Sequence, residues 1–134
     1  MTNIQNKIMS FFKNIFGSND SQENKSTSFW KEITSVEDVD QAILESHQKK
    51  VAVFKHSTRC FISKTVLRNF ENEVAQSNEE VSYYFLDLIQ HRGVSNFIAE
   101  KLNVEHQSPQ LIVLENGLVV NNASHQSISL DLVK

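Results

Sequence analysis

The chain has 134 residues, of which 40% are hydrophobic and 22% charged, and its formal net charge is −3. These values fit one ordinary globular domain and exclude both wholesale disorder and a second sizeable core. The small acidic excess excludes general electrostatic attraction to nucleic acid, and no apolar run approaches the roughly 18 residues of a membrane-spanning helix. We therefore expect a protein that neither binds nucleic acid nor crosses a membrane.

The first 16 residues have the pattern of an amphipathic helix. Their large apolar side chains, from Ile4 to Phe16, fall on one helical stripe, and Gly17 stands where a helix usually ends. Polar residues interrupt each apolar run and no small-residue cleavage site follows, which argues against a signal peptide and favours a cytoplasmic protein. A helix over residues 3–16 could contact a membrane surface peripherally, dock on its own domain or a protein partner, or stay disordered.

Residues 17–28 separate this helix from the rest of the chain. Their sequence, GSNDSQENKSTS, has no large apolar side chain and cannot repay the entropy of becoming ordered. The sequence therefore predicts an amphipathic helix within residues 1–16, a flexible linker over 17–28 and one folded α/β domain over 29–134.

Helical and strand patterns alternate within residues 29–134. In chain order we expect a helix capped by Ser35, a strand at 51–54, a helix at 66–76, a strand at 83–86, a helix at 94–102 and two strands at 111–114 and 118–120. Asn116-Gly117 between the last two is a strong hairpin signal, whereas the tail at 127–133 is ambiguous. The order predicts a mixed sheet, with parallel strands joined by helical crossovers, an antiparallel C-terminal hairpin and helices on both faces.

Cysteine occurs only once, as Cys60. A lone cysteine forms no internal disulfide, which excludes a disulfide-stapled scaffold and a zinc site built on several thiolates. Cys60 falls between a buried strand and the first turn of the next helix, where free amides and the positive end of the helix dipole favour a thiolate. Arg59, Lys64 and His56 could add positive charge. A buried structural cysteine is the alternative, and this position makes it less favoured.

Two further residues bear on a redox role. Ser63 stands three residues after Cys60, where a dithiol oxidoreductase has its resolving cysteine, so a redox cycle must pass through a mixed disulfide that an external thiol resolves. The only proline, Pro109, lies at the entry to a strand, where the Ser108–Pro109 bond is either cis or the proline merely begins an edge strand. The five scattered histidines predict no metal site.

Two stretches of sequence carry a resemblance to a known family. They are Phe54–Cys60 (FKHSTRC) followed by Ser63, and the pattern Val-x-His-x-Ser-Pro-Gln that ends at Gln110, with Ser124-His125 after the hairpin. Together they resemble the monothiol bacilliredoxins of the bacillithiol system, a group with the thioredoxin fold. The resemblance covers about residues 29–134 and implies a thioredoxin-like domain there.

The resemblance also implies roles for individual residues. Cys60 would be the nucleophile, Pro109 a cis-proline that faces it, and Ser108 the residue whose backbone pairs with a bound disulfide substrate. We expect the remaining substrate-binding residues to surround the cysteine: Thr58, Arg59, Phe61 and Ser63. Phe61 departs from the Cys-Pro-Ile-Ser sequence usual in the family, which removes a proline that pre-sets the first helical turn and adds an apolar wall beside the sulfur.

The implied activity is that of a monothiol thiol–disulfide oxidoreductase. It would remove a low-molecular-weight thiol such as bacillithiol from protein mixed disulfides, with S-thiolated proteins as partners and the small thiol as a co-substrate instead of a bound cofactor. Two alternatives stay open. One is a non-catalytic thioredoxin-like binding module positioned by its N-terminal helix. The other, by likeness to monothiol glutaredoxins, is an iron–sulfur cluster bridged between two subunits, which Phe61 would crowd.

Overall fold

The computed structural model describes residues 29–134, so the predicted helix 3–16 and linker 17–28 lie outside the described range. The elements are β1 (Trp30–Glu32), α2 (Val36–Glu45), β2 (Lys50–His56), α3 (Phe61–Ala75), β3 (Val81–Asp87), α4 (Arg92–Leu102), β4 (Gln110–Glu115), β5 (Leu118–Ser124) and the 3₁₀ helices η3 (His125–Ser127) and η4 (Leu130–Val133). Every helix and strand predicted within this range is present, and the ambiguous tail forms 3₁₀ helix. None of the helices in residues 29–134 has the length and hydropathy needed to cross a membrane.

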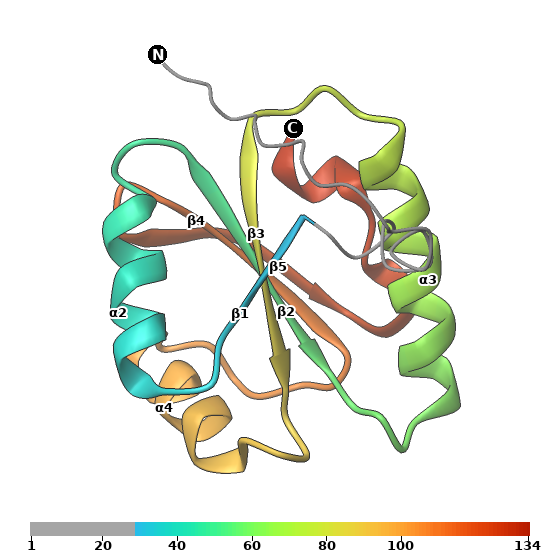
Figure 1. The fold of residues 1–134 in the computed structure, drawn as a ribbon, viewed down its shortest axis with the longest axis horizontal. Coiled ribbons are helices and arrows are strands. Elements are labelled where there is room, and N and C mark those ends of the chain that lie inside the picture. Colours follow the sequence, from blue (N-terminus) through green and yellow to red (C-terminus); the bar gives the residue numbers. More distant parts are fainter. Residues whose placement is uncertain (1–28) are drawn as a thin grey trace, which may run out of the picture.

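The five strands form one mixed sheet in the order β1-β3-β2-β4-β5 (Figure 1). β1 and β2 run parallel to β3, whereas β4 is antiparallel to both β2 and β5. The register pairs Lys55, near the end of β2, with Gln110, the first residue of β4. The segment that follows β2 and the segment that precedes β4 therefore meet at the same end of the sheet. This pairing brings Cys60 and Pro109 to one region of the molecule.

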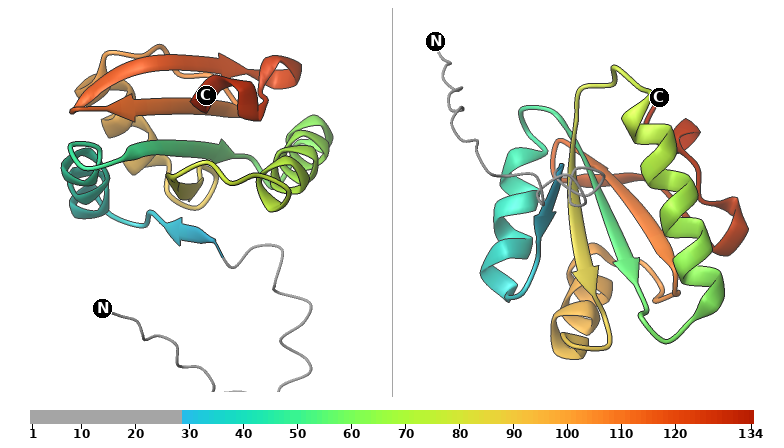
Figure 2. Two further views of the ribbon diagram at one scale, coloured as in Figure 1. Left: turned by 90° about the horizontal axis from the view of Figure 1, so that it is seen from above. Right: turned by 45° about the vertical axis from the view of Figure 1, so that its right-hand side comes forward.

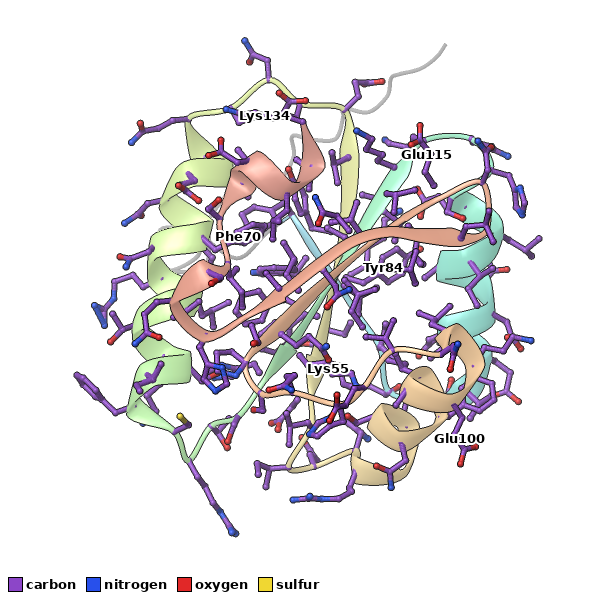
Figure 3. All side chains as sticks on the ribbon, turned by 180° about the vertical axis from the view of Figure 1, so that it is seen from behind. Lys55, Phe70, Tyr84, Glu100, Glu115 and Lys134 are labelled. Atoms are coloured by element: carbon purple, nitrogen blue, oxygen red, sulfur yellow. The ribbon has the colours of Figure 1, made fainter. Side chains whose placement is uncertain are left out.

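Helices cover both faces of the sheet, and each face has its own core (Figures 1 and 2). The core on the side of α2 and α4 includes Val53, Tyr84 and Ile98. The core on the side of α3 and the C-terminal 3₁₀ helices includes Phe54 and Phe70. Figure 3 shows Phe70 on the side of α3 and Tyr84 on the side of α2. β2 lies at the centre and is buried on both faces, which accounts for the continuous apolar run at residues 51–54.

Local signals explain where several elements begin and end. The Ser35 hydroxyl accepts a hydrogen bond from the Asp38 amide at the start of α2, as expected of an N-cap. Asn116 and Gly117 have φ angles of 55° and 79°, and two successive positive values define the tight turn of a β-hairpin. Gly93 lies in the first turn of α4.

Candidate functional site: the start of helix α3

Cys60 is the N-cap residue of α3. Its backbone is extended (φ −107°, ψ 120°), its amide donates to the carbonyl of Ser57 at 3.2 Å, and its carbonyl accepts from the amide of Lys64 at 3.1 Å. Its side chain makes no capping hydrogen bond, and the residue is partly exposed with a free thiol. The amides of the first helical turn have no intrahelical acceptor, so Cys60 stands where they and the helix dipole favour negative charge. It is therefore an accessible thiol and not a buried structural cysteine.

Ser63 and His56 form a buried pair at the base of the turn that carries Cys60. The Oγ atom of Ser63 lies 2.8 Å from Nδ1 of His56 and accepts a hydrogen bond from the Ser57 amide at 3.1 Å. Both side chains are buried. Burial lowers the pKa of His56; the carboxylate of Asp87 opposes this shift and the charge of Lys64 adds to it. His56 is therefore neutral near pH 7 and does not supply the positive charge that the sequence suggested.

The residues beside Cys60 form an exposed rim. Thr58 and Arg59 are exposed at the tip of the turn, and Phe61 is 77% exposed on the first turn of α3. Phe61 and its neighbour Ile62 border a cavity of about 370 Å³. Its remaining lining comes from α3 and the C-terminal segment: Thr65, Val66, Asn69, Gln126 and Ile128. The cysteine thus adjoins an exposed apolar surface.

The Ser108–Pro109 peptide bond is cis, which is one of the two arrangements that the sequence left open. Ser108 is half-buried and Pro109 is buried. The carbonyl of Pro109 accepts from the amide of His125 at 3.1 Å, and the next residue, Gln126 in η3, lines the cavity beside Phe61. The proline loop, η3 and the start of α3 therefore belong to one end of the molecule.

A buried glutamine braces the same loop from inside. The side chain of Gln110 is 1% exposed; its Oε1 accepts from the Gln107 amide at 3.3 Å, and its Nε2 donates to the Glu105 carbonyl at 3.0 Å. Both ends of the side-chain amide are thus used within the loop that leads to Ser108. In the sequence Gln110 stands out only as the last residue of the family pattern, which does not predict that its side chain braces the loop.

Lys55 is a further residue that sequence reasoning missed. It is fully buried on the side of the sheet that α4 covers (Figure 3). Its Nζ donates to the carbonyl of Ser95 at 3.2 Å and lies 3.3 Å from Nδ1 of His106, in the loop before Ser108. Burial lowers the pKa of Lys55 to about 8. Alternation along β2 places position 55 on the same face as the core residue Val53, and this signal was available in the sequence.

The sheet order, the helices on both faces, the free cysteine at the start of α3 and the cis-proline before β4 define a thioredoxin-like protein. A solved structure of a protein described as having a thioredoxin fold is 32% identical, with a TM-score of 0.70 over 79% of this chain and 91% of that one. Thioredoxin O2 from Arabidopsis thaliana (18% identity, TM-score 0.61, 81% and 97% covered) and mitochondrial thioredoxin 3 from Saccharomyces cerevisiae (15%, 0.59, 75% and 87%) share the fold.

The match between this sequence and a family model identifies the family. Residues 31–133 match the model of the monothiol bacilliredoxin BrxC family, and the chain belongs to that family. The resemblance drawn from the Cys60 and Pro109 stretches is thereby confirmed. Family and fold together give the protein a thiol–disulfide redox role, and its single cysteine, Cys60, fits the monothiol class.

Proposed function

We propose that the protein reduces mixed disulfides between protein cysteines and a low-molecular-weight thiol of the bacillithiol type, acting in the cytoplasm through Cys60. The observation that carries this proposal is the pairing of an accessible cysteine at the N-cap of α3 with a buried serine, Ser63, at the position of a resolving cysteine. Since serine forms no disulfide, only an external thiol can release a group bound to Cys60.

The proposed cycle has two exchange steps. The Cys60 thiolate attacks the sulfur of the small thiol in the mixed disulfide, the protein cysteine leaves as a thiolate and takes up a proton from solvent, and Cys60 keeps the small thiol. A second molecule of the small thiol, as its thiolate, then attacks the small-thiol sulfur that is bound to Cys60. This step releases the Cys60 thiolate and a symmetrical disulfide of the two small-thiol molecules. Each turnover thus oxidises one free small-thiol molecule, which leaves in the symmetrical disulfide with the small thiol taken from the protein, and no bound cofactor takes part.

The side chains around Cys60 suit a substrate that joins a charged small thiol to a polypeptide. Arg59 is exposed, and its guanidinium can donate charge-assisted hydrogen bonds to carboxylates of a small thiol. Phe61, with Ile62, offers exposed apolar area to the polypeptide. In this proposal Thr58 completes the site from the turn, buried Ser63 holds that turn through the Ser57 amide without touching substrate, and the backbone of Ser108 next to Pro109 pairs with the substrate as a short extended strand does.

Intact-mass analysis after incubation with a bacillithiolated or glutathionylated protein tests the proposal. We expect the mass of one small thiol to be added to the protein, release of the reduced substrate, and removal of the adduct when excess small thiol is supplied. Cys60→Ser is the matched control because the chain has no other cysteine. Absence of an adduct on the wild type, or an equal adduct on Cys60→Ser, would refute the proposal.

The non-catalytic alternative predicts a different result in a simpler measurement. A binding module needs no activated thiol, so its cysteine would react with iodoacetamide no faster at neutral pH than a small free thiol does. We expect Cys60 to react faster than such a thiol near pH 7, because the free amides and the dipole at the start of α3 favour negative charge at its position.

A further inference from the structure

Proton donation within the pair of Ser63 and His56 has a definite direction. Among the residues that the structure describes, Ser63 Oγ has two polar neighbours, the Ser57 amide and His56 Nδ1. An amide can only donate, so it occupies one lone pair of the oxygen. His56 Nδ1 is then the one neighbour that can accept the proton of the buried Ser63 hydroxyl, and a buried donor without an acceptor is costly. Donation in the opposite direction would leave two buried groups without a partner among the described residues, the hydroxyl proton and an unprotonated Nε2, so we expect neutral His56 to carry its proton on Nε2.

This pair is connected to the cysteine through the backbone of one turn. The Ser57 amide donates to Ser63 Oγ, and the Ser57 carbonyl accepts from the amide of Cys60. Thr58 and Arg59, between them, are exposed. The side chain of Ser63, on α3, thus holds the base of the turn. His56, the last residue of β2, sets the orientation of that side chain.

We propose that His56 is a positioning residue for Cys60 that acts through Ser63. By accepting the hydroxyl proton it fixes the side-chain orientation in which the Ser63 oxygen accepts from the Ser57 amide, and this hydrogen bond holds the turn and the cysteine at the amino end of α3. The inference deepens the proposed function and rests on it for the identity of the reacting sulfur.

The surroundings of His56 show how this arrangement responds to pH. Asp87 on β3 is its register partner, Lys64 lies on α3, and the rings of Phe54 and Phe85 lie within 6.5 Å and 5.5 Å of the imidazole. Lys55, its neighbour on β2, points to the opposite face of the sheet. When His56 takes up a second proton, on Nδ1, it becomes a donor to Ser63 Oγ and the hydroxyl proton loses its acceptor. Because the pKa of His56 is lowered, this reversal occurs below its ordinary value of 6.5.

Two substitutions of His56 separate its acceptor role from its titration. His56→Asn places an amide oxygen close to the position of Nδ1 and cannot titrate, whereas His56→Leu fills the space without an acceptor. We expect His56→Leu to slow alkylation of Cys60 near pH 7 by about three- to tenfold, the worth of one hydrogen bond, and His56→Asn to stay within about twofold of the wild type. The wild-type profile of rate against pH should show a second inflection below pH 6.5, and that of His56→Asn should lack it.

A double-mutant cycle tests whether His56 acts through Ser63. Ser63→Ala should slow alkylation as His56→Leu does, and the double variant should be no slower than either single one, because both remove the same connection. Multiplicative effects would overturn the proposal, as would a rate in His56→Leu that equals or exceeds the wild-type rate. Circular dichroism at each pH confirms that the compared chains are folded.

Nitrogen-15 spectra of histidine-labelled wild type give a readout that needs no variant. We expect His56 above pH 7 to show an unprotonated, hydrogen-bonded Nδ1 and a protonated Nε2; a protonated Nδ1 would overturn the inference. Neither this spectrum nor the alkylation cycle uses a mixed disulfide. Failure of the proposed function, seen as the lack of an adduct on Cys60, is therefore distinct from failure of the role given to His56.

Discussion

Phe61 occupies the first position of α3, where the family usually has proline. Cys60 already has the extended backbone that a residue before proline requires, and the amide of Phe61 has no intrahelical acceptor to lose. We therefore expect Phe61→Pro to fold normally and to raise the free energy of unfolding by about 0.5–1 kcal/mol, because proline restricts the unfolded chain. Urea denaturation of the two proteins measures this difference.

The same position tests contact with the protein substrate. Phe61→Pro and the control Phe61→Ala both remove an exposed ring, but only proline restricts the backbone. Both variants should lose kcat/KM for a mixed disulfide on a folded protein while keeping it for a small symmetrical disulfide. An equal loss with both substrates would contradict the assignment of Phe61 to polypeptide contact.

Because of Lys55, we expect the free energy of unfolding to rise with pH in the alkaline range. Burial lowers its pKa from 10.5 to about 8, so between these values the unfolded chain holds a proton that the folded chain has released, and stability rises with pH. In Lys55→Met this cost is absent. The stability of the variant relative to the wild type should therefore fall by up to about 3 kcal/mol between pH 7 and pH 10.5. Urea titrations across this range provide the test, and a difference that stays constant with pH would contradict it.

At the scale of elements, the β4–β5 hairpin is tied to α2. The Asn116 amide donates to the Ser46 carbonyl at 2.7 Å, and the Gly117 amide donates to the Ser46 hydroxyl at 2.8 Å. Ser46 caps the end of α2 and is buried. The hairpin turn thus helps to hold the helix that covers one core, in addition to setting the register of β5.

Gly117 is the residue of this turn that tolerates least change. Its φ is +79°, and an added Cβ would lie 3.1 Å from the ring of His47, so Gly117→Ala should cost about 1–2 kcal/mol in thermal unfolding. Gly93→Ala is the matched control, because in α4 the added carbon meets no atom and should stabilise the helix by up to about 1 kcal/mol. Equal effects of the two substitutions would contradict this reading of the turn.

At the scale of the whole molecule, residues 29–134 supply the two cores and the five-stranded sheet that the structure describes. Phe29 and Trp30 already pack against Tyr83 and the α3 side of the sheet. A chain that lacks residues 1–28 should therefore keep the Tm and the Cys60 alkylation rate of the full chain. A fall in Tm of several degrees would show that the missing segment contributes to the fold.

The same pair of chains tests the role predicted for residues 3–16. Stronger sedimentation of the full chain with anionic liposomes would support peripheral membrane contact through this segment. Equal sedimentation of both chains would reject it and leave docking on protein or disorder.

Local patterns determined much of this protein from sequence alone. Helical spacing, the Ser35 cap, the Asn116-Gly117 turn and the placement of Cys60 at a strand-to-helix junction each depend on neighbouring residues, so the chain displays them directly. Only the tertiary structure decided which distant groups meet. The pairing of β2 with β4 put the Ser108–Pro109 loop at the end of the sheet that carries Cys60, and burial turned His56 from an expected cation into a neutral partner of Ser63. Strand pairing and desolvation depend on groups far apart in the chain, and no local spacing records them.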